Sequence, residues 1–180
     1  MAAEFSEQLT LDRRTFFTEK RIPLFGMYFS FDQIEHTFLR KSKWKYSFGF
    51  WSNPFRSKIK RRLSVNKVDY RIHFLLNCGA NSCPIIRPLS LANLEDTLEN
   101  ATQDYLEQEV FVDRERRLIQ LNELFLFYLG DFGGKKGLRK ILRNLGITDA
   151  ESSRFKLKFT TFDKTPKLDY FAPNKSASPT

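Results

Sequence analysis

The sequence predicts a single α+β domain in which helices pack against an antiparallel or mixed sheet. A chain of 180 residues has the size of one domain. Its 19 phenylalanines supply the apolar volume of a core. Some segments repeat apolar residues every three or four positions, which is typical of helices, and others alternate apolar with polar residues, which is typical of strands. The presence of both patterns indicates the fold class.

The first half of the chain contains one predicted helix and two predicted extended segments. Residues 29–39 favour a short helix, because Ser30 is a good N-cap and the apolar residues after it recur at helical spacing. Residues 70–77 form a largely apolar run that suits a buried strand. Residues 43–50 alternate, so four aromatic side chains are expected on one side of an extended segment: Trp44, Tyr46, Phe48 and Phe50.

The second half of the chain contains two predicted helices and three predicted strands. Residues 90–105 predict the clearest helix, since their apolar residues recur every three or four positions. Residues 110–112 and 118–121 flank a polar turn, as the two strands of a hairpin do. Residues 135–145 favour another amphipathic helix, and residues 155–159 alternate in the manner of a half-exposed strand.

One segment carries the whole net charge of +9. Between Thr37 and Arg62 the chain has nine lysines and arginines and no acid, whereas the remaining residues are balanced in charge. A basic segment interleaved with aromatic residues is typical of contacts with nucleic acid, acidic lipid or another anionic partner. The alternative is a solvated basic face over a row of core aromatics. The predicted binding residues are Arg40, Lys43, Trp44, Lys45, Trp51, Arg61 and Arg62.

Three features predict an intracellular, cytoplasmic protein without a transmembrane segment. The mean hydropathy is −0.44, and no window approaches the ~20 uninterrupted apolar residues of a spanning helix. The first fifteen residues contain acids where a signal peptide has an apolar run. Two cysteines are too few for a secreted disulfide scaffold. The absence of a nucleotide-binding glycine motif predicts no cofactor.

The densest reactive chemistry lies between His73 and Pro84. Both cysteines and one of the two histidines fall in this short stretch. A strand that presents a histidine and then enters a glycine-containing turn with a thiol can place a base beside a nucleophile. Cys83 lies beyond the turn and folds back toward His73 more easily than Cys78, so Cys83 is the preferred thiolate candidate and Cys78 the second.

Two other interpretations of these residues remain open. Buried thiols are common and usually inert, and a core histidine can serve only to donate one hydrogen bond. The chain's soft ligands also form a two-Cys, two-His set, but their spacing differs from that of structural zinc sites, because the cysteines enclose four residues and the histidines are not paired locally. The sequence therefore predicts no metal site at these residues: His36, His73, Cys78 and Cys83.

Three segments resemble the family catalogued as domain of unknown function 547 (DUF547). Residues 30–40 match the pattern S-L-x-x-I-E-H-x-x-L-R, with Phe31 in place of leucine, and residues 71–84 match R-I-H-F-x-L-x-C-x-x-x-S-C-P. A third pattern, L-x-x-x-F-x-x-Y-x-x-D-F, is matched by Leu121, Phe125, Tyr128, Asp131 and Phe132. The resemblance divides the chain into an N-terminal extension (1–24), a DUF547-like domain (25–162) and a tail (163–180). The end of the tail, after Pro173, is expected to be disordered.

The resemblance implies a papain-like or transglutaminase-like fold, in which Cys, His and an acid or amide form the active constellation. The family's W-I-N-x-Y-N-like helix has no counterpart in residues 1–26, so the domain is expected to be N-terminally truncated. It would be a divergent or inactive Cys-His hydrolase or acyl-transfer enzyme, or else a non-catalytic binding or scaffolding module that uses residues 37–62. The resemblance gives His73 as the base, Cys83 or Cys78 as the nucleophile, and Glu35, His36 or Asn77 as the orienting group.

Overall fold

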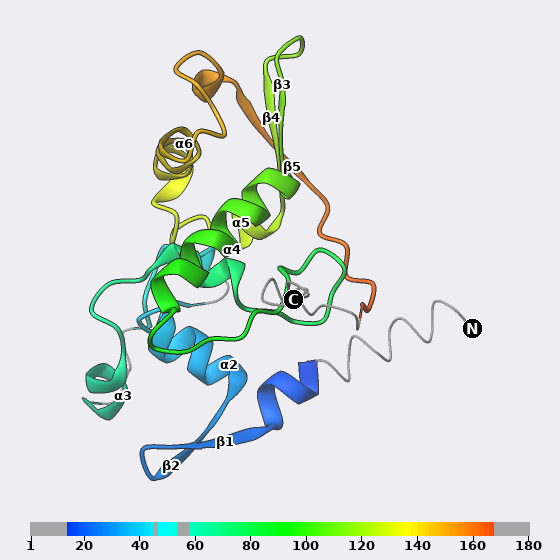
Figure 1. Ribbon diagram of the computed structural model, residues 1–180. Coiled ribbons are helices and arrows are strands. Elements are labelled where there is room, and N and C mark those ends of the chain that lie inside the picture. Colours follow the sequence, from blue (N-terminus) through cyan, green and yellow to red (C-terminus); the bar gives the residue numbers. More distant parts are fainter. Residues whose placement is uncertain (1–13, 45–46, 54–57, 168–180) are drawn as a thin grey trace, which may run out of the picture.

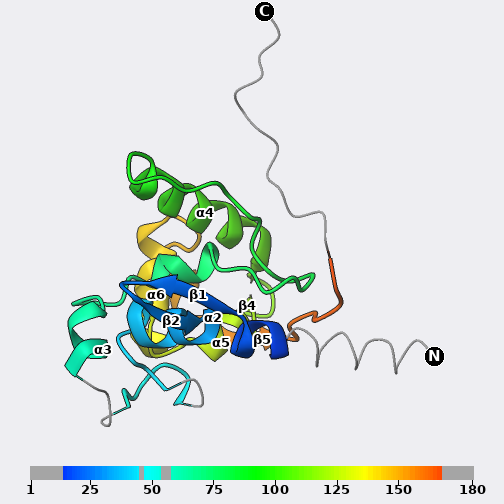
Figure 2. The same cartoon turned by 90° about the horizontal axis from the view of Figure 1, so that it is seen from below.

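The computed structural model describes residues 14–44, 47–53 and 58–167 (Figures 1 and 2). Helices and two small sheets together confirm the predicted α+β class. A helical segment over residues 14–19 precedes the first strand. The later elements, in chain order, are β1 (Arg21–Leu24), β2 (Met27–Ser30), α2 (Phe31–Gln33), η1 (Ile34–Leu39), α3 (Lys58–Leu63), η3 (Tyr70–Phe74), α4 (Leu94–Glu109), β3 (Val110–Asp113), β4 (Leu118–Asn122), α5 (Leu124–Phe127), α6 (Gly134–Asn144), η4 (Ser152–Arg154) and β5 (Lys156–Thr160).

The larger sheet is mixed and has the order β3-β4-β5. β3 and β4 form the predicted antiparallel hairpin, in which Val110 faces Leu121. β5 pairs with β4 in parallel, with Ile119 opposite Leu157. A parallel pair requires a crossover connection, and here the connection contains α5 and α6. The crossover is important because its first part enters the candidate site.

The core lies between α4, the mixed sheet and the crossover helices. Figure 2 shows α4 along one side of the molecule, with β1, β2 and α2 on the other. The centre of the core is formed by large apolar side chains that are fully buried: Phe74, Leu106, Ile119, Leu121, Phe125, Leu138 and Leu142. Their burial is the main favourable contribution to folding. In the described part of the chain, no helix combines the length and apolar character needed to cross a bilayer.

The predicted strand over residues 70–77 is wrong. Residues 70–74 form the 3-10 helix η3, because the Asp69 side chain caps it by accepting the backbone N–H of Arg71 at 3.0 Å. The Arg71 guanidinium also donates to Asp69. A short apolar run has no period that separates a strand from a buried helix. The helical turn buries His73 and Phe74 together.

The predicted extended segment over residues 43–50 is also wrong where it is described. The chain turns here, with positive φ at Phe48 (50°) and Gly49 (81°), and its only strand-like pairing among the described residues is the single bridge between Lys43 and Ser52. The aromatic side chains do not enter the core. They are about half exposed, at 54% for Trp44, 48% for Phe48 and 53% for Phe50. Lys45 and Tyr46 lie outside the described residues.

The other predicted elements are confirmed with shifted ends. The long helix begins at Leu94 instead of residue 90, because the Asn93 side chain accepts hydrogen bonds from the backbone and hydroxyl of Ser90 and holds a turn there. Residues 163–167 are bound to the loop after η3: Asn81 N–H donates to the Thr165 carbonyl at 2.8 Å. The predicted disordered end of the tail lies outside the described residues.

Candidate functional site

The first wall of the site is a π-helix, a rare form that is often found at functional sites. Ser30 caps α2 through a capping box with Gln33. The helix then widens into the π-helical η1, whose end is marked by the Arg40 N–H bonding to the Glu35 carbonyl. Glu35 on this helix and Arg40 at its end reach the crossover that joins β4 to β5, where they contact Tyr128 and Asp131.

Asp131, in that crossover, is the centre of a buried polar network. Its carboxylate accepts hydrogen bonds from Arg40 Nε at 2.6 Å and from His73 Nε2 at 2.9 Å. Lys43 Nζ lies 3.2 Å from its other oxygen. The side chains of Asp131, Arg40 and His73 are at most 1% exposed. Burial raises the pKa of Asp131, but the hydrogen bonds from His73 and Arg40 outweigh that effect and hold the pKa below its usual range.

Two glycines allow the backbone to approach this carboxylate. A Cβ atom on Gly49 would lie 2.7 Å from Asp131 Oδ1, and a Cβ atom on Gly130 would lie 2.4 Å from the Gly49 carbonyl carbon. Lys43 donates to the Gly49 carbonyl oxygen and thereby fastens the turn to the site. Gly130 N–H donates to the Phe48 carbonyl at 2.7 Å. The 47–50 turn therefore closes over Asp131 and excludes water.

His73 is held as a neutral imidazole with one nitrogen unused. Burial lowers the pKa of His73 and outweighs the hydrogen bond to Asp131, which raises it. Because the Asp131 carboxylate can only accept, Nε2 carries the proton and Nδ1 presents a lone pair. Among the described residues, Nδ1 has no hydrogen-bond partner. The ring stacks on Tyr128, with centroids 3.8 Å apart and planes at 15°.

Tyr128 joins the histidine to the π-helix. Its hydroxyl donates to Glu35 Oε1 at 3.0 Å, and the Arg40 guanidinium lies 4.6 Å from its ring centroid. Burial and the nearby Glu35 carboxylate raise the pKa of Tyr128 well above its usual range, so the hydroxyl stays protonated. Arg40 also donates to His36 Nδ1 at 2.7 Å, which fixes that nitrogen as an acceptor.

The two cysteines lie in one braced loop. Asn77 supports the loop from both ends, because its side chain donates to the Pro84 carbonyl and accepts the Gly79 N–H, each at 2.6 Å. Inside the loop the two sulfur atoms are 2.8 Å apart, and the Cys78 N–H donates to Cys83 Sγ at 3.1 Å. Cys78 is exposed and Cys83 is buried.

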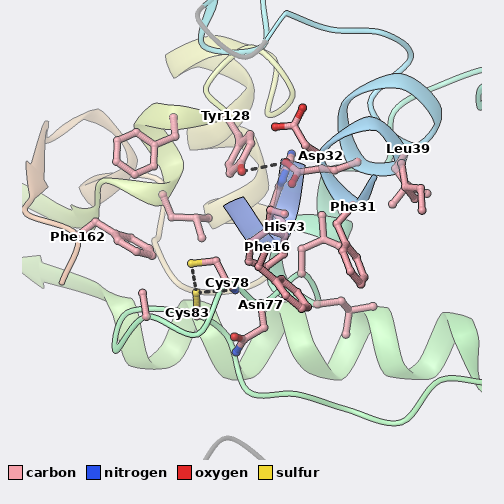
Figure 3. Close-up of a pocket in the computed structure, with 18 of the residues that line it drawn as sticks. Phe16, Phe31, Asp32, Leu39, His73, Asn77, Cys78, Cys83, Tyr128 and Phe162 are labelled. Atoms are coloured by element: carbon pink, nitrogen blue, oxygen red, sulfur yellow. Dashed lines mark hydrogen bonds between the residues drawn. The ribbon is translucent and has the colours of Figure 1, made fainter. Parts of the chain in front are cut away.

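A cavity of about 690 Å³ connects the thiols with the histidine (Figure 3). This volume is within the range of small-molecule sites, about 300 to 1,000 Å³. Figure 3 shows Cys78 and Cys83 near Phe162 on one side of the view, and Phe31 and Leu39 on the other. Besides the two thiols, the polar side chains that line the cavity are Arg14, Asp32, Glu35, His73, Asn77, Tyr128 and Lys164.

The structure changes the roles of several predicted residues. The group bonded to His73 is Asp131 rather than Glu35, His36 or Asn77. Glu35 and His36 instead contact Tyr128 and Arg40, and Asn77 braces the loop. Within the described ranges, no group of three or more His, Cys, Asp or Glu residues is arranged to hold a metal ion.

The predicted binding residues separate into buried and exposed groups. Arg40 is 0% exposed, so its prediction as a contact on a basic surface is wrong. Arg40 forms a buried ion pair with Asp131. Lys43, whose side chain is 18% exposed, forms an ion pair with the same carboxylate. Trp44 and Trp51 are exposed, at 54% and 72%, and the following residues on α3 are exposed as well: Arg61 and Arg62.

Comparison with known proteins identifies the family. The family model described as "Protein of unknown function, DUF547" matches residues 2–106, more than half of the chain. The chain belongs to the DUF547 family. The DUF547 match begins at residue 2, ahead of residue 25, the predicted start of the domain. No curated protein and no solved structure matches the chain.

Two site residues of this DUF547 domain were missed by sequence reasoning. Asp131 and Tyr128 lie beyond the range that the family model matches. The signal that could have found them is the third family pattern, which contains both residues next to buried phenylalanines. An acid and a tyrosine fixed in an otherwise apolar pattern indicate a partner for the histidine and arginine of the earlier patterns.

Proposed function

We propose that this DUF547 domain is a thiol-dependent acyl hydrolase or acyltransferase, with Cys78 as nucleophile and His73 as base. The observation that carries the proposal is the cavity that both side chains line. There His73 is neutral, bound to Asp131 through Nε2 and unpartnered at its buried Nδ1 among the described residues. A histidine positioned by a carboxylate and facing the same cavity as a thiol has the composition of a catalytic triad.

The reaction follows from these groups. His73 Nδ1 takes the proton of the Cys78 thiol, and the sulfur attacks the carbonyl carbon of an acyl ester, thioester or amide. The bond from carbon to the leaving group breaks, and the leaving group receives the proton from His73. Water or an acceptor alcohol or amine then attacks the thioester, its proton passes to His73 and on to the departing sulfur, and the thiol is regenerated. Asp131 is a positioning residue that keeps the imidazole in one tautomer.

Exposure favours Cys78 over Cys83, reversing the order expected from the sequence. Cys78 is the exposed thiol, and Cys83 is 8% exposed. The 2.8 Å contact allows the Cys83 thiol to donate to a Cys78 thiolate, while Cys83 Sγ accepts the Cys78 N–H. A thiolate that accepts a hydrogen bond is stabilised relative to the thiol. The buried cysteine would therefore support the exposed one.

The test is the rate of iodoacetamide labelling of each cysteine between about pH 5 and pH 9, since an ordinary thiol ionises near pH 8.5. Wild-type Cys78 should label rapidly below about pH 7, and His73→Gln, which can still donate to Asp131, should abolish this fast phase. Cys83→Ser is the matched control and should keep a His73-dependent phase. Slow labelling of Cys78 below the ordinary thiol range, or equal rates in wild type and His73→Gln, would remove the proposed nucleophile.

A second candidate function is binding to an anionic lipid surface through residues 37–62. The observation that favours it is the exposure of four aromatic side chains that precede a basic helix in the sequence: Trp44, Phe48, Phe50 and Trp51. α3 follows them with a mostly exposed, acid-free sequence, KIKRRL. Aromatic rings partition into the headgroup region of a bilayer, and each nearby Lys or Arg adds roughly 1 kcal/mol on an anionic membrane.

Vesicle sedimentation tests this second function. Vesicles with phosphatidylserine should bind the full chain, and Trp51→Ala combined with Arg61→Gln and Arg62→Gln should weaken binding at least tenfold. The matched control is Phe111→Ala with Lys135→Gln and Lys136→Gln, which removes an exposed aromatic and two exposed cations elsewhere. Equal loss in both triple variants would mean that net charge alone is responsible. Tighter binding to single-stranded nucleic acid than to vesicles would contradict the lipid assignment.

A further inference from the structure

We propose that the acyl group of the substrate is a long, unbranched apolar chain that occupies the cavity beside Cys78. The inference rests on the proposed acyl-transfer function and adds the substrate class. It is carried by one juxtaposition: the reactive thiol and the histidine line a cavity whose remaining wall is mostly apolar.

The wall is contributed by five parts of the chain. They are the 14–19 segment, the α2 and η1 region, the segment after η3, the region around α5 and the segment after β5. The rings of Phe16 and Phe31 stack, with centroids 5.3 Å apart, so the N-terminal segment contacts the start of α2 through aromatic rings. The apolar lining residues are Phe16, Phe17, Phe31, Ile34, Leu39, Leu75, Leu76, Ala80, Ile86, Leu124, Phe127 and Phe162.

The polar groups of the cavity are mostly engaged within the protein. Glu35 accepts from Tyr128, and Asn77 braces the cysteine loop. Asp32 lies 3.6 Å from His36 Nε2. These contacts leave little hydrogen-bonding capacity for a sugar, nucleotide or peptide backbone, each of which would carry unsatisfied polar groups into an apolar enclosure.

The size of the cavity argues against a small acyl group. A volume of about 690 Å³ is far more than an acetyl group fills, and a short chain would leave the phenylalanine and leucine side chains in contact with water. Each methylene that replaces such water improves affinity about fourfold, which corresponds to the transfer free energy of one methylene group. Two cations, Arg14 and Lys164, also line the cavity and favour an anionic ligand over a cationic one.

The test is calorimetric binding of the sodium salts of hexanoate, octanoate and decanoate to the full chain. Wild type and Cys78→Ser should both bind, with an affinity that rises about fourfold per methylene. Phe16→Asp introduces a charge into the wall at a residue that is already 45% exposed, and it should weaken decanoate binding at least tenfold. Phe111→Asp, at a 62% exposed residue that does not line the cavity, is the control and should leave it unchanged.

The outcomes separate this inference from the proposed function. Affinity that is independent of chain length, or equal loss in Phe16→Asp and Phe111→Asp, would overturn the acyl-chain assignment while the labelling of Cys78 could still support a reactive thiol. Suppose that fatty-acid affinity rises with acyl-chain length but Cys78 labels slowly and independently of His73. The acyl chain would then be a ligand and not a substrate, and the cavity would be a non-catalytic acyl-binding site.

Discussion

His73 and Asp131 are 58 residues apart in the sequence, and their side chains meet at 2.9 Å in a site that excludes solvent. Arg40 reaches the same carboxylate oxygen from a third part of the chain. The formal charges of Arg40 and Lys43 are offset by those of Asp131 and Glu35, so the imidazole can remain uncharged between them. This balance makes the network sensitive to the loss of any single charge.

Asp131→Asn should destabilise the protein by about 3 to 5 kcal/mol, because it leaves Arg40 charged, buried and without its carboxylate. The two side chains are at most 1% exposed. Urea unfolding monitored by tryptophan fluorescence measures the change. Asp149→Asn removes an equally close ion pair with Arg114 whose side chains are 60% and 51% exposed, and it should have a much smaller effect. A similar loss in both variants would show that burial does not set the strength of the Arg40 pair.

Gly49→Ala should destabilise the protein more than Gly146→Ala. Both glycines have positive φ, 81° and 75°, and the left-handed conformation alone costs an alanine about 1 to 2 kcal/mol. The two differ in their surroundings: a Cβ atom on Gly49 would lie 2.7 Å from Asp131 Oδ1, whereas Gly146 has nothing within 4 Å. The difference between their unfolding free energies measures the contact with Asp131. Equal values would mean that the 47–50 turn moves aside without cost.

Stability should fall as the pH decreases from about 6.5, the ordinary histidine value. Burial lowers the pKa of His73 in the folded protein, so in this range the unfolded chain binds a proton that the folded chain does not. The unfolding free energy therefore decreases with decreasing pH until the folded pKa is passed. His73→Gln removes this contribution, and its unfolding free energy should change less between pH 7 and pH 5. An equal pH dependence in wild type and His73→Gln would contradict a neutral buried imidazole.

Mild oxidation should inactivate the thiols as a pair. The Cys78 and Cys83 sulfurs are in contact at 2.8 Å, so diamide should take two electrons and two protons from them, becoming a hydrazine and leaving an intramolecular disulfide. Mass spectrometry after alkylation should then find neither cysteine labelled, and dithiothreitol should restore both. In Cys83→Ser, Cys78 should still label after the same treatment. Retention of both labels in oxidised wild type would rule out pairing within the loop.

The sequence predicts the helices and the sheet strands well where the period is long. The long helix, the β3–β4 hairpin and α6 are confirmed because each repeats its pattern over several residues or around a polar turn. The prediction fails at residues 70–77, because this apolar run is too short to show a period. Its helical conformation depends on the Asp69 cap, which the apolar pattern does not reveal. It also fails at residues 43–50, where the aromatic alternation resembles that of a core strand but Trp44, Phe48 and Phe50 are exposed.

The candidate site is only partly visible in the sequence. Local spacing identifies His73 and the cysteines, since they occur in one short stretch. Asp131 and Tyr128 enter the site through the crossover between β4 and β5. No local sequence pattern predicts that this crossover packs against η1. Arg40 illustrates the same limit, because a cation in a basic run is expected in solvent, and only the tertiary fold gives it a buried carboxylate.

The exposed turn at residues 114–117 divides the buried network between two halves of the chain. Arg40 and His73 precede that turn, whereas Tyr128 and Asp131 follow it. A polypeptide opened there would therefore place the two members of the Arg40–Asp131 ion pair on separate fragments, and neither fragment could neutralise its own charge. Fragment complementation would then depend on the ion pair itself. Association of the two fragments and recovery of Cys78 reactivity should therefore occur together and could be measured in one experiment.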